Sequence, residues 1–372
     1  MVFCPEHPPT ERKFGYPRCS MGHRGQACSI LALIALTVAP GCQPEFPEVS
    51  WKGRFLHVAQ TAAGEVCSGS NPYQDRYVEI LAHRLDIEID EPLRFAYIET
   101  AELQDYCFQD DIRGCYYDGN AYSTTPVQTH ELAHAVADRA GWMGPRAFSE
   151  GFAEAFGGDF DAGTQRLPIR EVVEHFEVSP DHYYTAALFV RFLIERHGVQ
   201  LLGDFMRGTE RDDELVSISE DFEAVFSEPL ESAFADFDGY PACSAWANHD
   251  AIVECSLPDL VWDGDVLKAN VPLDCSLETV VGPFVPGPRM WDTRAFSVSE
   301  DGDYIATVTT TGTSDAGVRI TRCGTCVEHV DEIVPADASG HPVRLRQGRY
   351  YVIFVADVSD ISELSLSLEP AL

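Results

Sequence analysis

Two histidines and a glutamate at helical spacing carry the clearest chemistry in this sequence. His130, Glu131 and His134 belong to the segment His-Glu-Leu-Ala-His. Residues four apart lie on the same face of a helix, so both imidazoles can reach one Zn²⁺ ion. The glutamate between them can then accept a proton from a water bound to that ion. The alternative is a surface helix with two solvated histidines, and the surrounding sequence has to decide between the two.

The flanking residues predict a helix that would hold this motif. Thr125 suits the N-cap, Pro126 suits the first helical position, and Gly141 suits the C-terminal stop. Apolar residues between these signals can be buried against the rest of the protein. We therefore expect the motif to lie inside a helix, as shared metal binding requires.

A third ligand is expected from the segment Phe-Ser-Glu-Gly-Phe-Ala-Glu-Ala-Phe, whose first glutamate is Glu150. Fifteen residues separate Glu150 from His134, enough for a turn and an antiparallel second helix. Three protein ligands would leave one position open for water. Glu154 lies one turn later and could accept the free N–H of a ligating histidine. The alternative is a glutamate pair on a solvated helix face.

Together the two segments resemble the gluzincin metallopeptidases. His-Glu-Leu-Ala-His followed by Ser-Glu-Gly-Phe-Ala-Glu-Ala-Phe is similar to the "HExxH … EGxAE" arrangement of the peptidase-MA-like group, over roughly residues 50–240. The resemblance implies zinc held by His130, His134 and Glu150, with Glu131 as the catalytic base. The gap before the glutamate is shorter than in members resembling thermolysin and the alanyl aminopeptidases.

The same resemblance implies a tyrosine that stabilises the tetrahedral intermediate. It would open the helix after the glutamate ligand, and residues 181–198 have helical spacing with Gly198 as the stop. Tyr184 matches this position best, and Tyr183 and His182 are rivals. The alternative is that both tyrosines are core aromatics. The resemblance also implies that the last strand before the motif helix, near Tyr116 to Ser123, is a sheet edge that pairs with the substrate backbone.

Charge and composition limit the function. The 372 residues include 60 acidic and 26 basic ones, which gives a net charge of −34, and 45% are apolar. Such a chain is globular and long enough for two domains. The acidic balance argues against nucleic-acid binding and against binding to anionic membrane surfaces. A preference for basic substrates is possible on this balance, but no motif supports it.

The N-terminal region resembles an export signal. A short basic stretch starts at Met21, an apolar stretch runs over residues 30–38, and Ala-Pro-Gly precedes Cys42. The resemblance to a bacterial lipobox predicts lipid attachment at Cys42 after removal of residues 1–41, with Met21 as the true start. The alternative is an ordinary secretory signal. We expect an exported protein, anchored to a bacterial membrane by lipid or else periplasmic or extracellular.

The cysteines agree with export. Beyond Cys42 an even number remain, which predicts disulfides. Cys107 with Cys115 and Cys243 with Cys255 are close enough in sequence to pair. In Cys323-Gly-Thr-Cys326 we expect a structural disulfide rather than half a zinc site or a redox pair. The eight cysteines are Cys67, Cys107, Cys115, Cys243, Cys255, Cys275, Cys323 and Cys326.

Two regions follow the leader, which predicts three parts: 1–41, 42–242 and 243–372. Residues 42–242 predict an α+β domain, a small sheet followed by helices. Residues 243–372 predict an all-β sandwich, because short β-branched runs alternate with turns there. That second region resembles the pre-peptidase C-terminal type of sandwich. The predicted elements include strands at 54–59, 92–98, 114–122, 295–298, 304–309, 318–320 and 350–355, and helices at 71–85, 199–206 and 221–237.

The sequence thus predicts a secreted zinc-dependent peptidase, with zinc as cofactor and a peptide or protein as substrate. One alternative is an inactive peptidase-fold lipoprotein that acts as a binding module. Another is a zinc hydrolase of non-peptide amides or esters. The complete set of ligands and base in His130, Glu131, His134 and Glu150 argues against the first alternative, because an inactive relic would be free to lose any of them.

Overall fold

The structure, a computed structural model, describes residues 44–107, 112–158, 165–242, 251–284, 288–312, 316–324, 331–336 and 340–371. The chain divides into two compact units, Met1–Glu45 and Phe46–Leu372, and the elements below belong to the second. The predicted leader and Cys42 lie outside the described residues, as do Cys243 and Cys326. No helix among the described residues is long and apolar enough to cross a membrane.

A five-stranded sheet opens this unit, with the order β1-β2-β3-β5-β4. β2, β3 and β5 are parallel, while β1 and β4 run antiparallel to their neighbours at the two edges. The predicted single strand over 114–122 is a hairpin, because Asp118 and Gly119 both adopt a positive φ in the turn. The strands are β1 (Val49–Lys52), β2 (Leu56–Gln60), β3 (Leu93–Tyr97), β4 (Gly114–Tyr117) and β5 (Asn120–Ser123).

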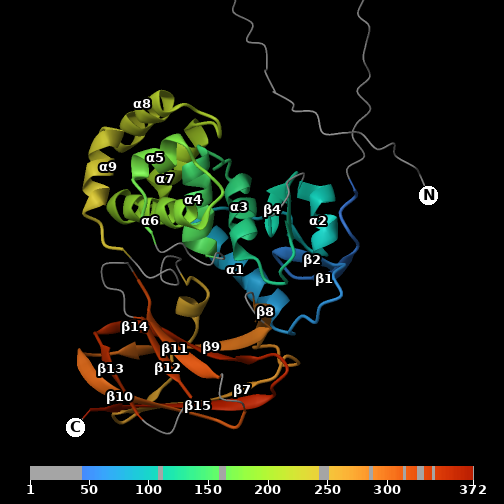
Figure 1. The fold of residues 1–372 in the computed structure, drawn as a ribbon, viewed down its shortest axis with the longest axis vertical. Coiled ribbons are helices and arrows are strands. Elements are labelled where there is room, and N and C mark those ends of the chain that lie inside the picture. The colour runs from blue at the N-terminus through green and yellow to red at the C-terminus, as the bar shows by residue number, and fades with distance from the viewer. Residues whose placement is uncertain are drawn as a thin grey trace, which may run out of the picture. The chain divides into compact units, whose positions relative to one another are not determined.

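Helices make up most of the rest of this region and share one hydrophobic core with the sheet. Within it α4 packs against both α3 and α6. Figure 1 shows α4 to α7 gathered beside α3. The helices are α1 (Ser70–Leu85), α2 (Thr100–Cys107), α3 (Thr129–Arg139), α4 (Arg146–Gly157), α5 (Ile169–Glu174), α6 (Pro180–His197), α7 (Val199–Gly208), α8 (Leu215–Phe226) and α9 (Leu230–Asp238).

Two of the predicted helices differ from those in the structure. The motif helix α3 begins at Thr129 rather than after Thr125, because the backbone N–H of Gln128 donates to the buried side chain of Gln74 instead of entering the helix. The predicted helix over 221–237 is two helices, α8 and α9. Ser227 has a positive φ of 58°, and Pro229 follows it, so the chain turns there. Gly141, the predicted stop, does adopt a positive φ just after α3.

The C-terminal region contains two further five-stranded sheets, with the orders β13-β10-β15-β7-β6 and β12-β11-β14-β9-β8. Their buried faces share a second hydrophobic core, so the sheets pack face to face as a sandwich. Figure 1 shows β9, β11 and β14 in one layer and β7, β10 and β15 in the other. The strands are β6 (Trp262–Asp263), β7 (Val266–Leu273), β8 (Val281–Phe284), β9 (Arg289–Val298), β10 (Gly302–Thr310), β11 (Gly317–Arg322), β12 (Asp331–Pro335), β13 (His341–Leu345), β14 (Gly348–Asp357) and β15 (Ser362–Pro370).

Disulfides join described residues within and between these regions. Cys107 pairs with Cys115, as predicted. The predicted pairing of Cys255 with Cys243 is wrong, because Cys255 pairs with Cys323. Cys323 therefore forms a structural disulfide, but not within its own Cys-Gly-Thr-Cys motif. Cys255 lies in the short 3₁₀ turn Glu254–Ser256, which packs on β9 and β14, and Cys323 follows β11, the neighbour of β14. The third pair, Cys67 with Cys275, connects the residues before α1 to those after β7.

Candidate metal centre

The antiparallel packing of α3 and α4 assembles the predicted ligand set. Thr129, the first residue of α3, donates its hydroxyl to the carbonyl of Gly157, the last residue of α4, at 2.5 Å. Gly157 has no side chain to separate the helices, and a Cβ there would lie 2.5 Å from Cα of His130. This close contact brings the second turn of α4, which carries Glu150, beside the histidines of α3.

The ligand atoms of His130, His134 and Glu150 all lie within 4.8 Å of one another. One carboxylate oxygen of Glu150 is 3.1 Å from Nε2 of His134 and 3.5 Å from Nε2 of His130. A tetrahedral zinc site with bonds of about 2.0–2.1 Å spaces its ligand atoms roughly 3.3 Å apart. The three side chains are only 3%, 7% and 9% exposed. The spacing and the nitrogen and oxygen donors therefore fit a zinc ion.

Further hydrogen-bond partners outside the ligand set orient the side chains of His130 and Glu150. The Nδ1 atom of His130 lies 3.2 Å from a carboxylate oxygen of Glu154, which leaves Nε2 to face Glu150. The other oxygen of Glu150 accepts a hydrogen bond of 2.9 Å from Nη2 of Arg211. Such partners fix the ring and carboxylate orientations that a metal site requires. The Glu154 contact is the one that the sequence indicated, whereas Arg211 lies far along the chain and was not anticipated.

Electrostatic coupling within the cluster is strong. Burial disfavours the charged form of His130, but hydrogen bonds to Glu150 and Glu154 outweigh it and raise its pKa well above the usual value. Burial also opposes ionisation of Glu150, yet the charge of His134 and the hydrogen bonds from both histidines hold its pKa well below the usual range. The carboxylate of Glu150 and the imidazole of His130 thus stabilise each other's charges.

Glu131 lies beside this cluster, in the wall of a cavity of about 320 Å³. Burial raises the pKa of its carboxyl group, because the charges of His130 and His134 offset only part of the desolvation. Gly114, the first residue of β4, approaches it closely: a Cβ on Gly114 would be 3.1 Å from Oε1 of Glu131. A glycine here lets the backbone of β4 pass next to the predicted base.

The edge strand that borders the cavity is β4, not the last strand before the motif helix. That last strand, β5, lies between β3 and β4 and is paired on both sides. The hairpin turn explains the difference, because it folds β4 back along the outside of β5. The residues that line the cavity come from β4 and the segment before it, from α3, α4, α6 and the loops beside them, and from the loop between α7 and α8. They are Ile112, Arg113, Gly114, Cys115, Tyr116, Gln128, His130, Glu131, His134, Met143, Arg146, Glu150, Val178, Pro180, Tyr183 and Arg211.

Tyr183, rather than Tyr184, lines the cavity. Its ring centroid is 5.7 Å from that of His130, and its pKa is raised by burial and then by the charges of Glu150 and Glu131. Tyr184 is absent from the lining residues; burial raises its pKa, and the charge of Arg166 opposes that rise. His182, the other rival, has its Nδ1 atom 2.7 Å from the hydroxyl of Ser179 at the start of α6.

A signal for Tyr183 is present in the sequence. Tyr183 precedes Ala186 and Ala187 by three and four positions, so the three residues share one face of α6. Small residues on that face let α4 pack closely, since a Cβ on Gly151 would lie 2.6 Å from the carbonyl oxygen of Ala186. The tyrosine on the face that meets α4 therefore reaches the candidate centre. No comparable local pattern marks Arg146 or Arg211.

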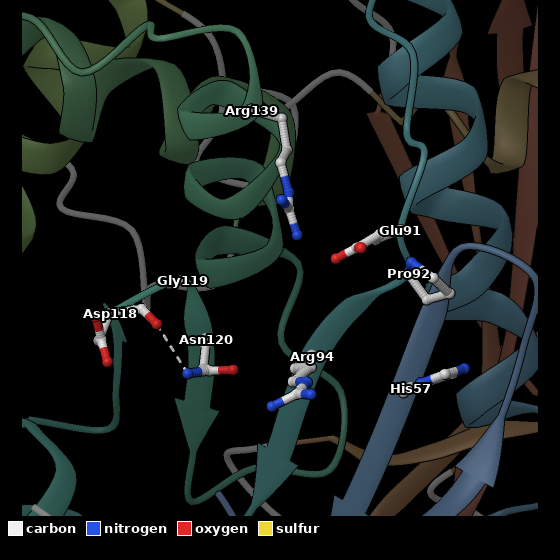
Figure 2. Close-up of a pocket in the computed structure, with 8 residues that line it drawn as sticks. All are labelled: His57, Glu91, Pro92, Arg94, Asp118, Gly119, Asn120 and Arg139. Atoms are coloured by element: carbon white, nitrogen blue, oxygen red, sulfur yellow. Dashed lines mark hydrogen bonds between the residues drawn. The ribbon is translucent and has the colours of Figure 1, made fainter.

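A second cavity carries no comparable cluster. It lies over β2, β3 and β5 and beside the end of α3, where His57, Arg94 and Asn120 occupy paired positions on neighbouring strands (Figure 2). Arg139 reaches toward it from the end of α3, and Asn120 is bonded to the carbonyl of Asp118 at 2.9 Å. Within the described part of the chain, the group of side chains close enough to share one metal ion is His130, His134 and Glu150.

No protein-family model and no curated protein matches this chain. The pre-peptidase C-terminal domain of collagenase from Bacillus anthracis is 12% identical, over 27% of this chain and 87% of that domain, with a TM-score of 0.21. A GH26-CBM35 β-(1,4)-mannanase from Podospora anserina is 11% identical over 28% of each chain, with a TM-score of 0.18. TmCBM61, in complex with β-1,4-galactotriose, is 11% identical over 29% of this chain and 84% of its own, with a TM-score of 0.17. These similarities are too low to carry an argument about fold or function.

Proposed function

We propose that this chain is a zinc-dependent peptidase of the gluzincin type. The observation that carries the proposal is the buried cluster of His130, His134 and Glu150, whose ligand atoms lie within 4.8 Å of one another. Glu131 lines the same cavity, so a candidate base accompanies the candidate ligands. A zinc ion held there would polarise the scissile carbonyl and lower the pKa of a water molecule that it binds.

Glu131 and Tyr183 would supply the remaining catalytic groups, the base and the oxyanion donor. Glu131 accepts a proton from the attacking water as the water oxygen bonds to the carbonyl carbon. As the C–N bond breaks, Glu131 passes that proton to the leaving amine. The Tyr183 hydroxyl donates a hydrogen bond to the oxyanion that forms on the carbonyl oxygen, and keeps its proton. The position of Tyr183 in the cavity wall, with its ring centroid 5.7 Å from that of His130, supports this role.

The edge strand β4 supports a peptide as substrate. An exposed edge offers unpaired backbone groups to an extended peptide, which can add to the sheet as a further strand. β4 borders the cavity through Gly114, Cys115 and Tyr116. A peptide paired with β4 would pass directly beside Glu131. This observation favours peptide bonds over the small amides or esters that the chemistry alone also permits.

Export remains part of the proposal. The disulfides among the described residues suit an oxidising compartment. We propose that Cys42 carries the lipid anchor. Replacing Cys42 with Ser should then move the protein from the membrane fraction to the soluble exported fraction.

The decisive experiment for the activity is cleavage of a peptide library by the purified protein, with and without a zinc chelator. Cleavage should stop on chelation and return when zinc is added. The Glu131→Gln variant should keep its zinc and its fold while losing most activity, since an amide cannot accept the proton. Unchanged cleavage by that variant would point to another base, and cleavage that resists chelation would exclude a metallopeptidase.

A further inference from the structure

The cavity at the candidate centre has a basic wall in a strongly acidic protein. The chain carries a net charge of −34, yet three arginines line this cavity: Arg113, Arg146 and Arg211. The acidic side chains among the lining residues are Glu131 and Glu150, both already assigned to the proposed centre. The field that a ligand meets is set mainly by the nearest charges, so the net charge of the chain does not describe this cavity.

Two of these arginines, Arg146 and Arg211, are neighbours, but their side chains have different hydrogen-bond partners. The backbone N–H of Arg146 donates to the carbonyl of Arg211 at 3.3 Å, which holds the two residues side by side. Arg211 uses Nη2 to hold Glu150, and its side chain is 45% exposed. Arg146, by contrast, has a buried Nε atom with no hydrogen-bond partner among the described residues.

Arg146 and Tyr183 line the same cavity and share an aromatic neighbour. The guanidinium carbon of Arg146 lies 5.5 Å from the ring centroid of Phe176, and that ring is 5.3 Å from the ring of Tyr183. The guanidinium therefore belongs to the same wall as the tyrosine proposed to stabilise the oxyanion. Because Arg146 lines the cavity, a ligand there can supply hydrogen-bond acceptors to its guanidinium. A carboxylate matches a guanidinium best, because it can accept two parallel hydrogen bonds.

We infer that Arg146, assisted by Arg211, binds a carboxylate of the substrate beside the scissile bond. The inference rests on the proposed peptidase function and names its substrate class. The carboxylate has two possible sources in a peptide, the side chain of Asp or Glu and the free C-terminus. An Asp or Glu source would make the preferred substrate acidic, which is the opposite of the preference for basic substrates that the overall charge would suggest. A C-terminal source would instead restrict cleavage to bonds near a free chain end.

The experiment uses matched peptides. Two pairs of peptides carry either Glu or Gln beside the cleaved bond, one pair on its N-terminal side and the other on its C-terminal side. A third pair differs only in having a free or an amidated C-terminus. We expect the wild type to favour one carboxylate-bearing member by at least about tenfold in kcat/KM, the range of charged hydrogen bonds. The pair that shows the preference identifies the source. In Arg146→Gln the ratio should fall close to one, while Arg146→Lys should retain part of it.

Arg139→Gln is the matched control, because Arg139 is an exposed arginine that lines the second cavity (Figure 2). In the Arg139→Gln variant, the ratio of kcat/KM between the two members of each peptide pair should equal that of the wild type. Equal kcat/KM for both members of every pair in the wild type would overturn the inference, whether or not the Arg146 variants fold. A ratio that persists in Arg146→Gln would overturn it as well.

A binding measurement separates this inference from the proposed function. The same peptides are titrated by calorimetry into Glu131→Gln and into the Glu131→Gln, Arg146→Gln double variant. Carboxylate-dependent binding that disappears in the double variant supports the inference, even if the wild type cleaves no peptide and the proposed function fails. Cleavage without any carboxylate preference leaves the peptidase standing and rejects the inference.

Discussion

At the scale of single residues, Glu150 is the side chain that contacts the most members of the candidate centre. One of its oxygens faces both histidines, and the other accepts from Arg211. A carboxylate held on both oxygens has little freedom to rotate, so it is preorganised for a metal. His130 is held in the same way by Glu154. The Nε2 atom of His134 contacts Glu150 at 3.1 Å, so removal of His134 would empty one ligand position while leaving the other two oriented.

The first prediction therefore concerns His134. His134→Ala should lower zinc affinity by more than about 100-fold, since loss of even an outer partner of a ligand costs 10–100-fold. Elemental analysis after dialysis against a weak chelator measures the retained zinc. His182→Ala is the control, because His182 bonds to Ser179 instead of joining the ligand set. Full zinc occupancy in His134→Ala would reject the ligand assignment.

The second prediction distinguishes the adjacent tyrosines. Tyr183→Phe should lower kcat by about 10²-fold or more with little change in zinc content, judging from other oxyanion donors. Tyr184→Phe should behave nearly as the wild type, because Tyr184 does not line the cavity. Both variants are assayed on one peptide. A large loss in Tyr184→Phe alone would return the role to the residue that the sequence favoured.

These residues also show what a sequence can predict at this scale. His130 and His134 lie on one helix, so their spacing alone brings them together. The contact of Tyr183 with the site depends on the rotation of α6, which its packing on α4 decides. Arg211 meets Glu150 across 61 positions, and no local pattern predicts such a contact.

At the scale of elements, the contact between α3 and α4 sets the geometry of the centre. The end of α4 presses on the start of α3, where the first ligand lies, and only a glycine fits between the backbones. The pairing of the two helices could be anticipated from the turn signals and the ligand spacing. The start of α3 could not, because the partner of Gln128 is Gln74 on α1, outside the local sequence.

The third prediction tests this contact. Gly157→Ala should destabilise the protein by about 1–3 kcal/mol and weaken zinc binding, since the added methyl group forces the helices apart at His130. Chemical denaturation gives the stability, and competition with a chelator gives the zinc affinity. Gly208→Ala is the matched control: Gly208 also ends a helix, and a Cβ there would meet nothing within 4 Å. Equal effects of both substitutions would contradict this prediction, because helix propensity favours Ala over Gly at both sites and only Gly157 has a close packing contact.

At the scale of the whole molecule, the C-terminal β-region is bonded to the helices near the centre. Beside the disulfide of Cys67 with Cys275, the hydroxyl of Ser70 donates to the carbonyl of Gly282 at 2.8 Å. Tyr73 donates to Glu254 at 2.7 Å, and burial, followed by the charge of Glu254, raises the pKa of Tyr73 well above its usual value. The sequence predicted two regions, but these links join residues about 180 to 210 positions apart, for which it has no signal.

The last prediction follows from the span of that disulfide. A cross-link over 208 positions removes much more freedom from the unfolded chain than one over 8 positions. Loss of the Cys67–Cys275 link should cost at most about 5 kcal/mol, and loss of the Cys107–Cys115 link about 2–3 kcal/mol. Thermal unfolding of the two double Cys→Ser variants, without reductant, compares them directly. The Cys67→Ser, Cys275→Ser variant should have the lower midpoint, by several degrees. A larger loss in the Cys107→Ser, Cys115→Ser variant would mean that the short link stabilises the folded hairpin rather than restricting the unfolded chain.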